Sequence, residues 1–218
     1  MIEEFSRLYP SVYHAADEAA RPQIERYGLL SSKAISQLVS PGRSDESALV
    51  RRLKCERVGN FEIGSFVLRD QKPLNEKKLT SCLTDGLTVQ QWLSILNEKV
   101  FFWATPARLG TFVAHYTNQI ILQLNTHALL KQVQHRTSIA VINTGSVYRK
   151  PARRGRETFV PLAKWQRREN GKTRDAAELV VDNVVDVASA VDISCCRPTW
   201  HSSINSLHRS ASGSSLWN

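Results

Sequence analysis

The stretch Val100-Phe101-Phe102-Trp103-Ala104-Thr105-Pro106 decides how the middle of this chain folds. Its first five residues are apolar and three of them are aromatic, which is typical of a buried β-strand. Thr105 is a favoured residue at the N-cap of a helix, and Pro106 is favoured at the first helical position. The sequence therefore predicts a strand that leads directly into a helix.

Other elements are predicted on both sides of this unit. Extended runs are predicted at Ser11–His14, Phe61–Leu68, Gln119–Leu124, Thr137–Ile142 and Glu178–Val181. Helices are predicted near the start of the chain, at 45–54, after the capping-box pattern Thr88-Val89-Gln90-Gln91, and from Thr126, which can act as an N-cap. Gly28 suits a left-handed helix C-cap. Because strands and helices are interspersed without a regular βαβ rhythm, we expect a mixed α+β domain.

The composition is that of a folded protein, with 218 residues, 42% of them hydrophobic. We expect a single domain over residues 1–196 and a disordered serine-rich tail over 197–218. No run reaches the roughly 18 apolar residues of a membrane span, and the first residues are acidic where a signal peptide would be basic, so we expect a cytoplasmic protein with no membrane partner. The 4 Cys lack paired CxxC spacing and are expected to be reduced thiols.

The formal charge of +9 is concentrated in one window. Between Arg149 and Arg174 there are ten basic and two acidic residues, a net charge of +8. Such a window attracts polyanions, although a run of charge is also the ordinary composition of a solvated surface. The candidate nucleic-acid contacts are Arg149, Lys150, Arg153, Arg154 and Arg156. Glu157 lies among these cations, and a surface ion pair is its simplest role.

Several common enzyme motifs are absent, namely GxGxxG, GxxxxGKS/T, GxSxG and HExxH. The remaining candidates are dispersed, and each has an ordinary structural interpretation. His14 can be a hydrogen-bonded structural histidine, Phe101 and Trp103 can be core aromatics, and Glu178 can be an exposed carboxylate at a strand end. Residues Asn143-Thr144-Gly145-Ser146 form either a simple turn or a loop near a cleft that supplies backbone donors.

Taken in order, these dispersed residues resemble the three motifs of ADP-ribosyltransferases. Val12-Tyr13-His14, followed by Ile24 and Gly28-Leu29-Leu30-Ser31, is similar to the first motif, and Val100 to Thr105 is similar to the second. Ala177-Glu178-Leu179-Val180-Val181 resembles the third motif, and in particular that of the DarT group, which ADP-ribosylates DNA. The resemblance covers about residues 9–193 and extends to a family of small bacterial proteins of this kind.

The resemblance implies split, mixed β-sheets flanked by helices, with NAD as co-substrate and no metal. It implies a toxin-like mono-ADP-ribosyltransferase, a glycosyltransferase that cleaves the nicotinamide–ribose bond and transfers ADP-ribose to DNA, RNA or a protein. Glu178 would stabilise the oxocarbenium-like ribosyl cation, and His14 would hold the adenosine ribose. Phe101 would stack on nicotinamide, at a position where the family often has tyrosine.

Further contacts with NAD are assigned by the same resemblance. Gly28 and Trp103 would help to form the NAD site, while Arg69 and Arg108 are the candidates for the phosphates. The DarT likeness also raises an antitoxin or hydrolase as a partner. Two alternatives keep the fold: a catalytically silent nucleic-acid-binding module, and an RNA 2′-phosphotransferase-like enzyme that also consumes NAD.

Overall fold

The computed structural model describes residues 1–41, 54–69, 75–114, 118–147, 151–169, 171–187 and 191–192. The α-helices are α1 (Ile2–Leu8), α2 (Arg21–Tyr27), α3 (Ser32–Val39), α5 (Glu76–Cys82), α6 (Val89–Asn97), α7 (Pro106–Val113) and α8 (Thr126–Val133). Short 3-10 turns are η1 (Glu18–Ala20), η2 (Gln134–Arg136), η3 (Arg156–Thr158) and η4 (Leu162–Lys164). The expected helix at 45–54 and the expected tail at 197–218 lie outside the described residues, apart from Lys54.

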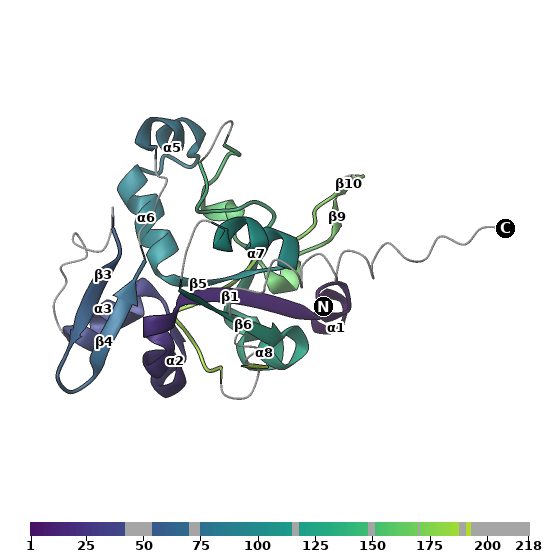
Figure 1. The fold of residues 1–218 in the computed structure, drawn as a ribbon. Coiled ribbons are helices and arrows are strands. Elements are labelled where there is room, and N and C mark those ends of the chain that lie inside the picture. The colour runs from purple at the N-terminus through teal and green to yellow at the C-terminus, as the bar shows by residue number, and fades with distance from the viewer. Residues whose placement is uncertain are drawn as a thin grey trace.

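The larger strands are β1 (Ser11–Asp17), β3 (Glu56–Asn60), β4 (Gly64–Leu68), β5 (Lys99–Trp103), β6 (Gln119–Asn125), β7 (Thr137–Ala140) and β11 (Glu178–Asp182). The two-residue strands are β2 (Leu29–Leu30), β8 (Val160–Pro161), β9 (Arg168–Glu169), β10 (Lys172–Thr173), β12 (Val184–Val185) and β13 (Val191–Asp192). The main sheet has seven strands in the order β13-β6-β1-β5-β11-β7-β8. Figure 1 shows β6, β1 and β5 side by side within it. The α+β class is confirmed.

The expectation of mixed sheets is wrong, because every pairing in the main sheet is antiparallel. A parallel pair needs a long crossover between neighbouring strands, and the neighbours in this sheet run in opposite directions. The central pairing is also uneven. β1 pairs with β6 along its whole length but with β5 only where Tyr13 lies opposite Trp103. The sheet therefore loosens between β1 and β5, beside the aromatic strand.

Helices cover both faces of the sheet (Figure 1). On one face, Phe5 of α1 and Leu129 of α8 pack with Phe102 and Leu179 of the central strands. The other face carries α5, α6 and α7. This arrangement follows from alternation along the strands, since successive side chains point to opposite faces.

Several local predictions are confirmed by the structure. β5 and α7 have the predicted order, and α6 begins with a capping box. The Gln91 N–H donates to Thr88 Oγ1 at 3.2 Å, and the Thr88 N–H donates to Gln91 Oε1 at 2.9 Å. The cap predicted at Thr126 is wrong by one residue, because Asn125 accepts from the Ala128 N–H at 3.0 Å. Asparagine is a stronger N-cap than threonine.

The extended run predicted at Phe61–Leu68 is only partly confirmed. Its second half forms β4, whereas residues 61–63 form a turn. Asn60 Oδ1 accepts from the Glu62 and Ile63 N–H groups at 3.0 Å each, and Gly64 has φ +80. These features reverse the chain, so that β4 pairs with β3 as a hairpin.

Gly28 is predicted to tolerate no side chain. It follows α2 with φ +76 and ψ −167, and a Cβ atom would lie 2.3 Å from Val185 O. We expect Gly28→Ala to lower the free energy of unfolding by at least about 1–3 kcal/mol, the usual strain of such a backbone conformation, with a further loss from the contact. Urea denaturation measures this change. Gly86→Ala is the matched control, because Gly86 has φ +66 but its Cβ would meet nothing within 4 Å. An equal loss of stability at both positions would exclude the contact with Val185 as a cause of the loss at Gly28.

Candidate active site

Glu178 is a buried carboxylate at the first position of β11, with 6% of its surface exposed. The backbone positions it from both sides, because Ala177 donates to Ala140 O at 2.8 Å and accepts from the Ala104 N–H at 3.2 Å. The Thr144 N–H lies 3.3 Å from each carboxylate oxygen, and Thr144 Oγ1 donates to Oε2 at 2.7 Å. The structure therefore does not place Glu178 as an exposed strand-end residue.

Burial raises the pKa of Glu178 from its usual 4.5 to about 7. Desolvation is the main cause, because an ionised carboxylate loses hydration inside the protein. The hydrogen bonds from Thr144 and the charges of Arg108 and Arg154 act in the opposite direction and favour ionisation. Glu178 is thus balanced between its neutral and ionised forms near pH 7, which is a common property of catalytic carboxylates.

His14 lies where β1 separates from β5. Its Nδ1–H donates to Phe101 O at 2.8 Å, which leaves Nε2 as an acceptor in the neutral ring. Burial is the main cause that lowers the pKa of His14 from 6.5 to about 4, and the charge of Arg69 adds to this effect. His14 is therefore neutral at physiological pH and can accept a hydrogen bond.

Glu178 and His14 lie near one another but project differently. Tyr13, Trp103 and Glu178 form one row across three adjacent strands, so that Glu178 and Tyr13 are separated by two strand spacings, roughly 10 Å. Alternation places Tyr13, rather than His14, on the face of Glu178. The His14 ring instead lies 5.7 Å from the Phe102 ring, at the gap between the strands.

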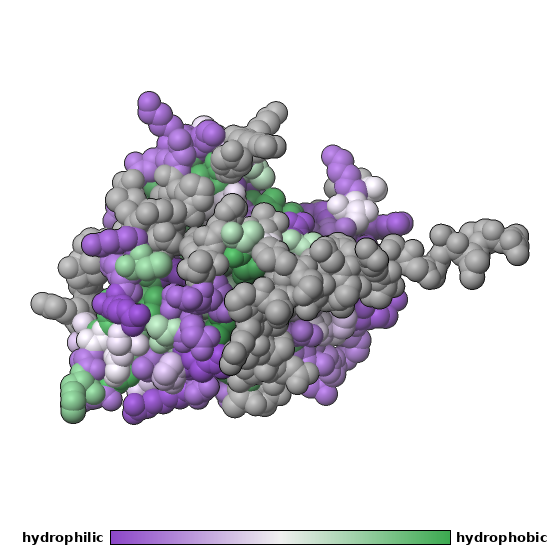
Figure 2. Space-filling model, viewed as in Figure 1, coloured by the Kyte–Doolittle hydropathy of each residue, from purple (hydrophilic) through white to green (hydrophobic). Residues whose placement is uncertain are grey.

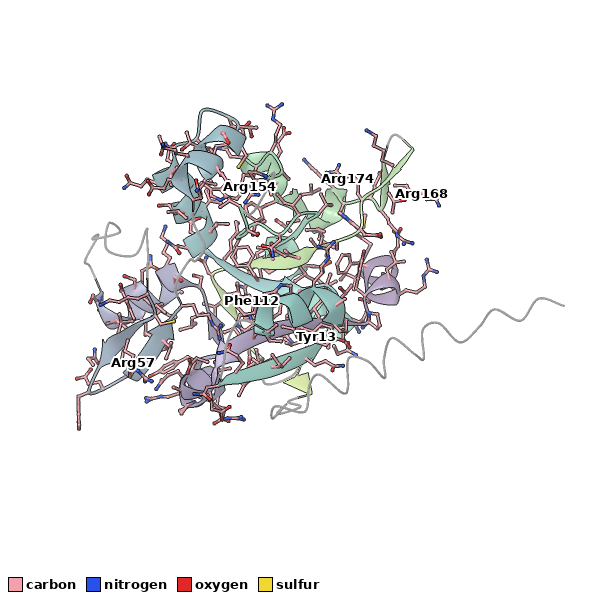
Figure 3. The ribbon with its side chains drawn as sticks, turned by 45° about the horizontal axis from the view of Figure 1, so that its top comes forward. Tyr13, Arg57, Phe112, Arg154, Arg168 and Arg174 are labelled. Carbon is pink, nitrogen blue, oxygen red and sulfur yellow. The ribbon has the colours of Figure 1, made fainter. Side chains whose placement is uncertain are left out.

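Trp103 and Phe112 form an aromatic pair on the Glu178 side of the sheet. Their ring centroids are 4.6 Å apart, and Tyr13 belongs to the same cluster under α7 (Figure 3). Trp103 Nε1 is buried and has no hydrogen-bond partner among the residues that the structure describes. A buried indole N–H normally has a partner, so this donor is available to a ligand.

Two arginines flank this cluster. The Arg69 guanidinium lies 5.3 Å from the Phe112 ring and hydrogen-bonds to Gln119. Its charge reaches His14, whereas the charge of the exposed Arg108 on α7 reaches Glu178. Of the predicted site residues, the structure therefore places Glu178 and Trp103 in one row, and the charge of Arg108 acts on Glu178. Arg69 lies against Phe112 and acts on His14, which projects from the other face of the sheet.

Phe101 and Gly28 have evident structural roles. The Phe101 ring faces the cluster that contains Phe159, with ring centroids 6.4 Å apart, and the Phe101 carbonyl holds His14. Gly28 packs against the backbone of Val185. Neither residue shows a contact with Glu178.

The residues predicted to contact nucleic acid differ in their exposure to solvent. Arg149 and Lys150 lie outside the described residues, and Arg153 and Arg156 are exposed. Arg154 is corrected, because its side chain is 2% exposed and cannot reach a nucleic acid from the protein interior. Figure 3 shows Arg154 within the molecule, while Arg168 and Arg174 lie at the projecting β9–β10 hairpin. This hairpin lies in a region that appears hydrophilic in Figure 2.

The hydrogen bond between Thr144 and Glu178 could not be predicted from the sequence. Residues 144–145 form a turn, and the Thr144 N–H in this turn donates to Glu178, so each of the two interpretations of the loop describes part of it. A threonine in a short polar segment after an apolar strand was the available signal, but this signal occurs in many simple turns.

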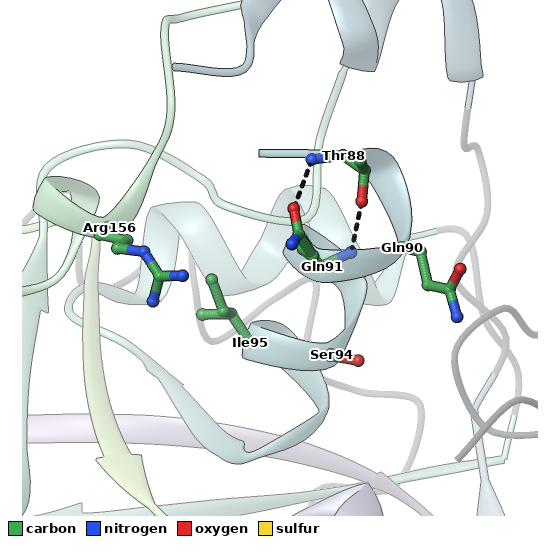
Figure 4. Close-up of a pocket in the computed structure, with 6 residues that line it drawn as sticks. All are labelled: Thr88, Gln90, Gln91, Ser94, Ile95 and Arg156. Carbon is green, nitrogen blue, oxygen red and sulfur yellow. Dashed lines mark hydrogen bonds between the residues drawn. The ribbon is translucent and has the colours of Figure 1, made fainter. Parts of the chain in front are cut away.

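A separate pocket of about 390 Å³ lies at the start of α6. It is lined by Thr88, Gln90, Gln91, Ser94, Ile95 and Arg156 (Figure 4). The capping box already occupies Thr88 and Gln91. This pocket does not include Glu178 or His14.

The described ranges contain no group of three or more His, Cys, Asp or Glu side chains that could hold a metal ion. They also contain no helix with the length and apolarity that a bilayer crossing requires. Cys55 and Cys82 are free thiols.

The two shifted pKa values predict opposite effects of pH on stability. The folded state holds a proton on Glu178 more tightly than the unfolded chain, so this contribution is lost as pH rises from 4.5 to 7. The folded state holds a proton on His14 less tightly, so stability increases as pH rises from about 4 to 6.5.

Chemical denaturation of two variants measures these effects. The stability of wild type minus that of Glu178→Gln is expected to fall with rising pH, by at most about 1.4 kcal/mol per pH unit. The same difference for His14→Asn is expected to rise, less steeply because the ring is partly exposed. Taking the difference between wild type and variant cancels the pH dependence that comes from titratable groups common to both proteins. Slopes of the same sign would contradict the assignment.

Together, the fold and site define an antiparallel α+β domain with a buried glutamate on a central strand and a neutral histidine beside the gap. Residues 10–191 match DUF7002, a family of unknown function, and the chain belongs to this family. A search of curated protein sequences gives no match to this chain.

Proposed function

We propose that this protein is an NAD-dependent ADP-ribosyltransferase. The observation that carries the proposal is the buried Glu178 in the same row of the sheet as Trp103, whose indole N–H has no partner among the described residues. The motif order in the sequence adds support. The split arrangement that the resemblance implies is part of the same proposal, and the single pairing between β1 and β5 supports it.

The residues around Glu178 fit the chemical parts of NAD. Arg69 and Arg108 supply positive charge for the diphosphate, and the neutral His14 supplies an acceptor for a ribose hydroxyl. Trp103 supplies an aromatic face and a donor for the nicotinamide end.

Ionised Glu178 would act on the ribose that carries nicotinamide. It would accept a hydrogen bond from a ribose hydroxyl and stabilise the positive charge that develops on the sugar. The glycosidic bond breaks with its electron pair leaving on nicotinamide, and the acceptor atom bonds to the sugar and loses a proton. Thr144 and Arg108 favour the ionised form that this step requires.

The proposed acceptor is a nucleic acid rather than a protein. The segment at 153–172, which precedes Glu178 in the sequence, carries five exposed basic residues: Arg153, Arg156, Lys164, Arg168 and Lys172. Phosphates are attracted to such a surface by a salt-dependent interaction. This observation also favours the second candidate, a nucleic-acid-binding module without catalysis.

Incubation of the full chain with adenylate-labelled NAD and duplex DNA, single-stranded DNA, RNA or protein tests both candidates. We expect nicotinamide release and covalent label on a nucleic acid. RNA that carries a 2′-phosphate tests the phosphotransferase alternative by the mass of its product. Binding that weakens steeply with salt, without NAD turnover, would support the binding module and contradict the proposed enzyme.

A further inference from the structure

Arg154 is a buried cation that donates hydrogen bonds to three backbone carbonyls and also contacts the Cys82 thiol. Nη1 donates to Thr144 O at 2.8 Å, Nη2 to Ser146 O at 3.0 Å, and Nε to Ala152 O at 3.2 Å. Burial lowers the pKa of Arg154, since desolvation disfavours its charge. A buried guanidinium without an ion pair to the described residues is unusual, because arginine is almost never fully buried unless it is paired.

The backbone of Arg154 is anchored separately from its side chain. The Arg154 N–H donates to Cys82 O at 2.9 Å, at the end of α5. Arg154 O accepts from the Thr84 N–H at 2.9 Å and from Thr84 Oγ1 at 3.2 Å. One segment, residues 82–84, which is far from Arg154 in the sequence, therefore holds its backbone, while its guanidinium bonds to the loop at 144–146.

Thr144 connects Arg154 to Glu178. Its carbonyl accepts from Arg154, while its N–H and hydroxyl donate to the Glu178 carboxylate. The charged or titratable groups near Glu178 and Thr144 come from three residues. Arg108 on α7 and Arg154 act on Glu178 through their charges, and the Cys82 thiol lies against Arg154.

We propose that Arg154 is a positioning residue that holds the loop at 144–146 and thereby fixes and polarises the Glu178 carboxylate. Its rigid planar fork presents separate N–H donors to two loop carbonyls in a fixed geometry, whereas lysine carries its donors on a single nitrogen at the end of a flexible stem. Arg154 also places a positive charge near Glu178 without blocking it, because no direct bond joins the two side chains. The importance for catalysis rests on the proposed function, whereas the control of the carboxylate does not.

NMR titration of the full chain with carboxyl-labelled glutamate tests this role without any substrate. Arg154→Gln removes the positive charge and weakens the hydrogen bonds to the loop at 144–146. Because both changes disfavour ionisation of Glu178, its titration is expected to move upward by roughly one pH unit. Arg154→Lys retains the charge and should move the titration less. In both variants the Thr144 amide should exchange with solvent at least about tenfold faster, while amides of Leu179 to Val181 change little.

Arg153→Gln is the matched control, because it removes the same charge from an exposed neighbour. It is expected to leave the titration of Glu178 and the exchange of Thr144 unchanged. A folded Arg154→Gln protein with a wild-type Glu178 titration would overturn the proposal. Equal acceleration of exchange at Thr144 and in β11 would also overturn it, since that result indicates general destabilisation.

Wild-type protein provides a measurement that does not depend on how well the variants fold. The Thr144 amide and the Arg154 Nε–H signals are expected to shift with the same midpoint as the Glu178 carboxyl. Absence of that midpoint from both signals would overturn the proposal. If these signals behave as expected but NAD is not turned over, the proposed reaction fails and the positioning role stands. If NAD is turned over but neither signal shows the shared midpoint, the proposed reaction stands and the positioning role fails.

Discussion

Replacing Glu178 by glutamine is expected to lower the rate of nicotinamide release from NAD by roughly a hundredfold to a thousandfold. The amide has the shape of the carboxylate and can still accept from Thr144, but it carries no negative charge to stabilise the ribosyl cation. Single-turnover measurement with saturating NAD isolates this step from binding. The wild-type rate should also rise with pH through about 7, the pKa of Glu178.

Stability should separate this catalytic effect from unfolding. Glutamine avoids burying a charge, so the variant should be at least as stable as wild type above pH 7. Glu157→Gln is the matched control, because Glu157 is an exposed carboxylate, and its nicotinamide release should stay near the wild-type rate. Full activity in the Glu178→Gln protein would eliminate Glu178 as the catalytic carboxylate.

Phe102→Ala is expected to lower the free energy of unfolding by about 3–5 kcal/mol. Phe102 is 0% exposed at the centre of the main core, where it packs between the strands and the helices of one face. Removal of the ring loses apolar burial and leaves a cavity. Urea denaturation measures the loss, and Phe102→Leu gives a smaller change if the alanine variant is too unstable to purify.

Phe61→Ala is the control with the same chemical change. Phe61 is 104% exposed, at the turn between β3 and β4, so its truncation should alter stability by less than about 0.5 kcal/mol. Similar losses at Phe61 and Phe102 would contradict the packing of β5 in the centre of the sheet.

The parts of the fold that could be predicted depend on residues close together in sequence. The Thr88 cap and the β5–α7 junction involve contacts within a few positions, and both were found. The main sheet was partly predictable, since its five long strands carry apolar runs. The antiparallel order was not, because each pairing depends on which distant strands meet.

The candidate site was predicted less completely than the strands. Glu178 and His14 were chosen from the order of motifs, but alternation along β1 and the register with Trp103 set their directions. Arg154 was assigned to the surface because it lies in a basic window. Its burial depends on anchoring to Cys82 and Thr84, which are far away in the sequence.

The sequence by itself determined the α+β class, the aromatic strand, the helix cap at Thr88 and the residue types available for chemistry. Local backbone preference and apolar periodicity are enough for these features, since they act over one or two turns of chain. Only the tertiary structure decided that Thr144 bonds to Glu178, that His14 bonds to the Phe101 carbonyl, and that Arg154 is buried behind the loop. Desolvation and hydrogen bonding between distant segments set the ionisation of these groups, and both arise only when the chain is folded.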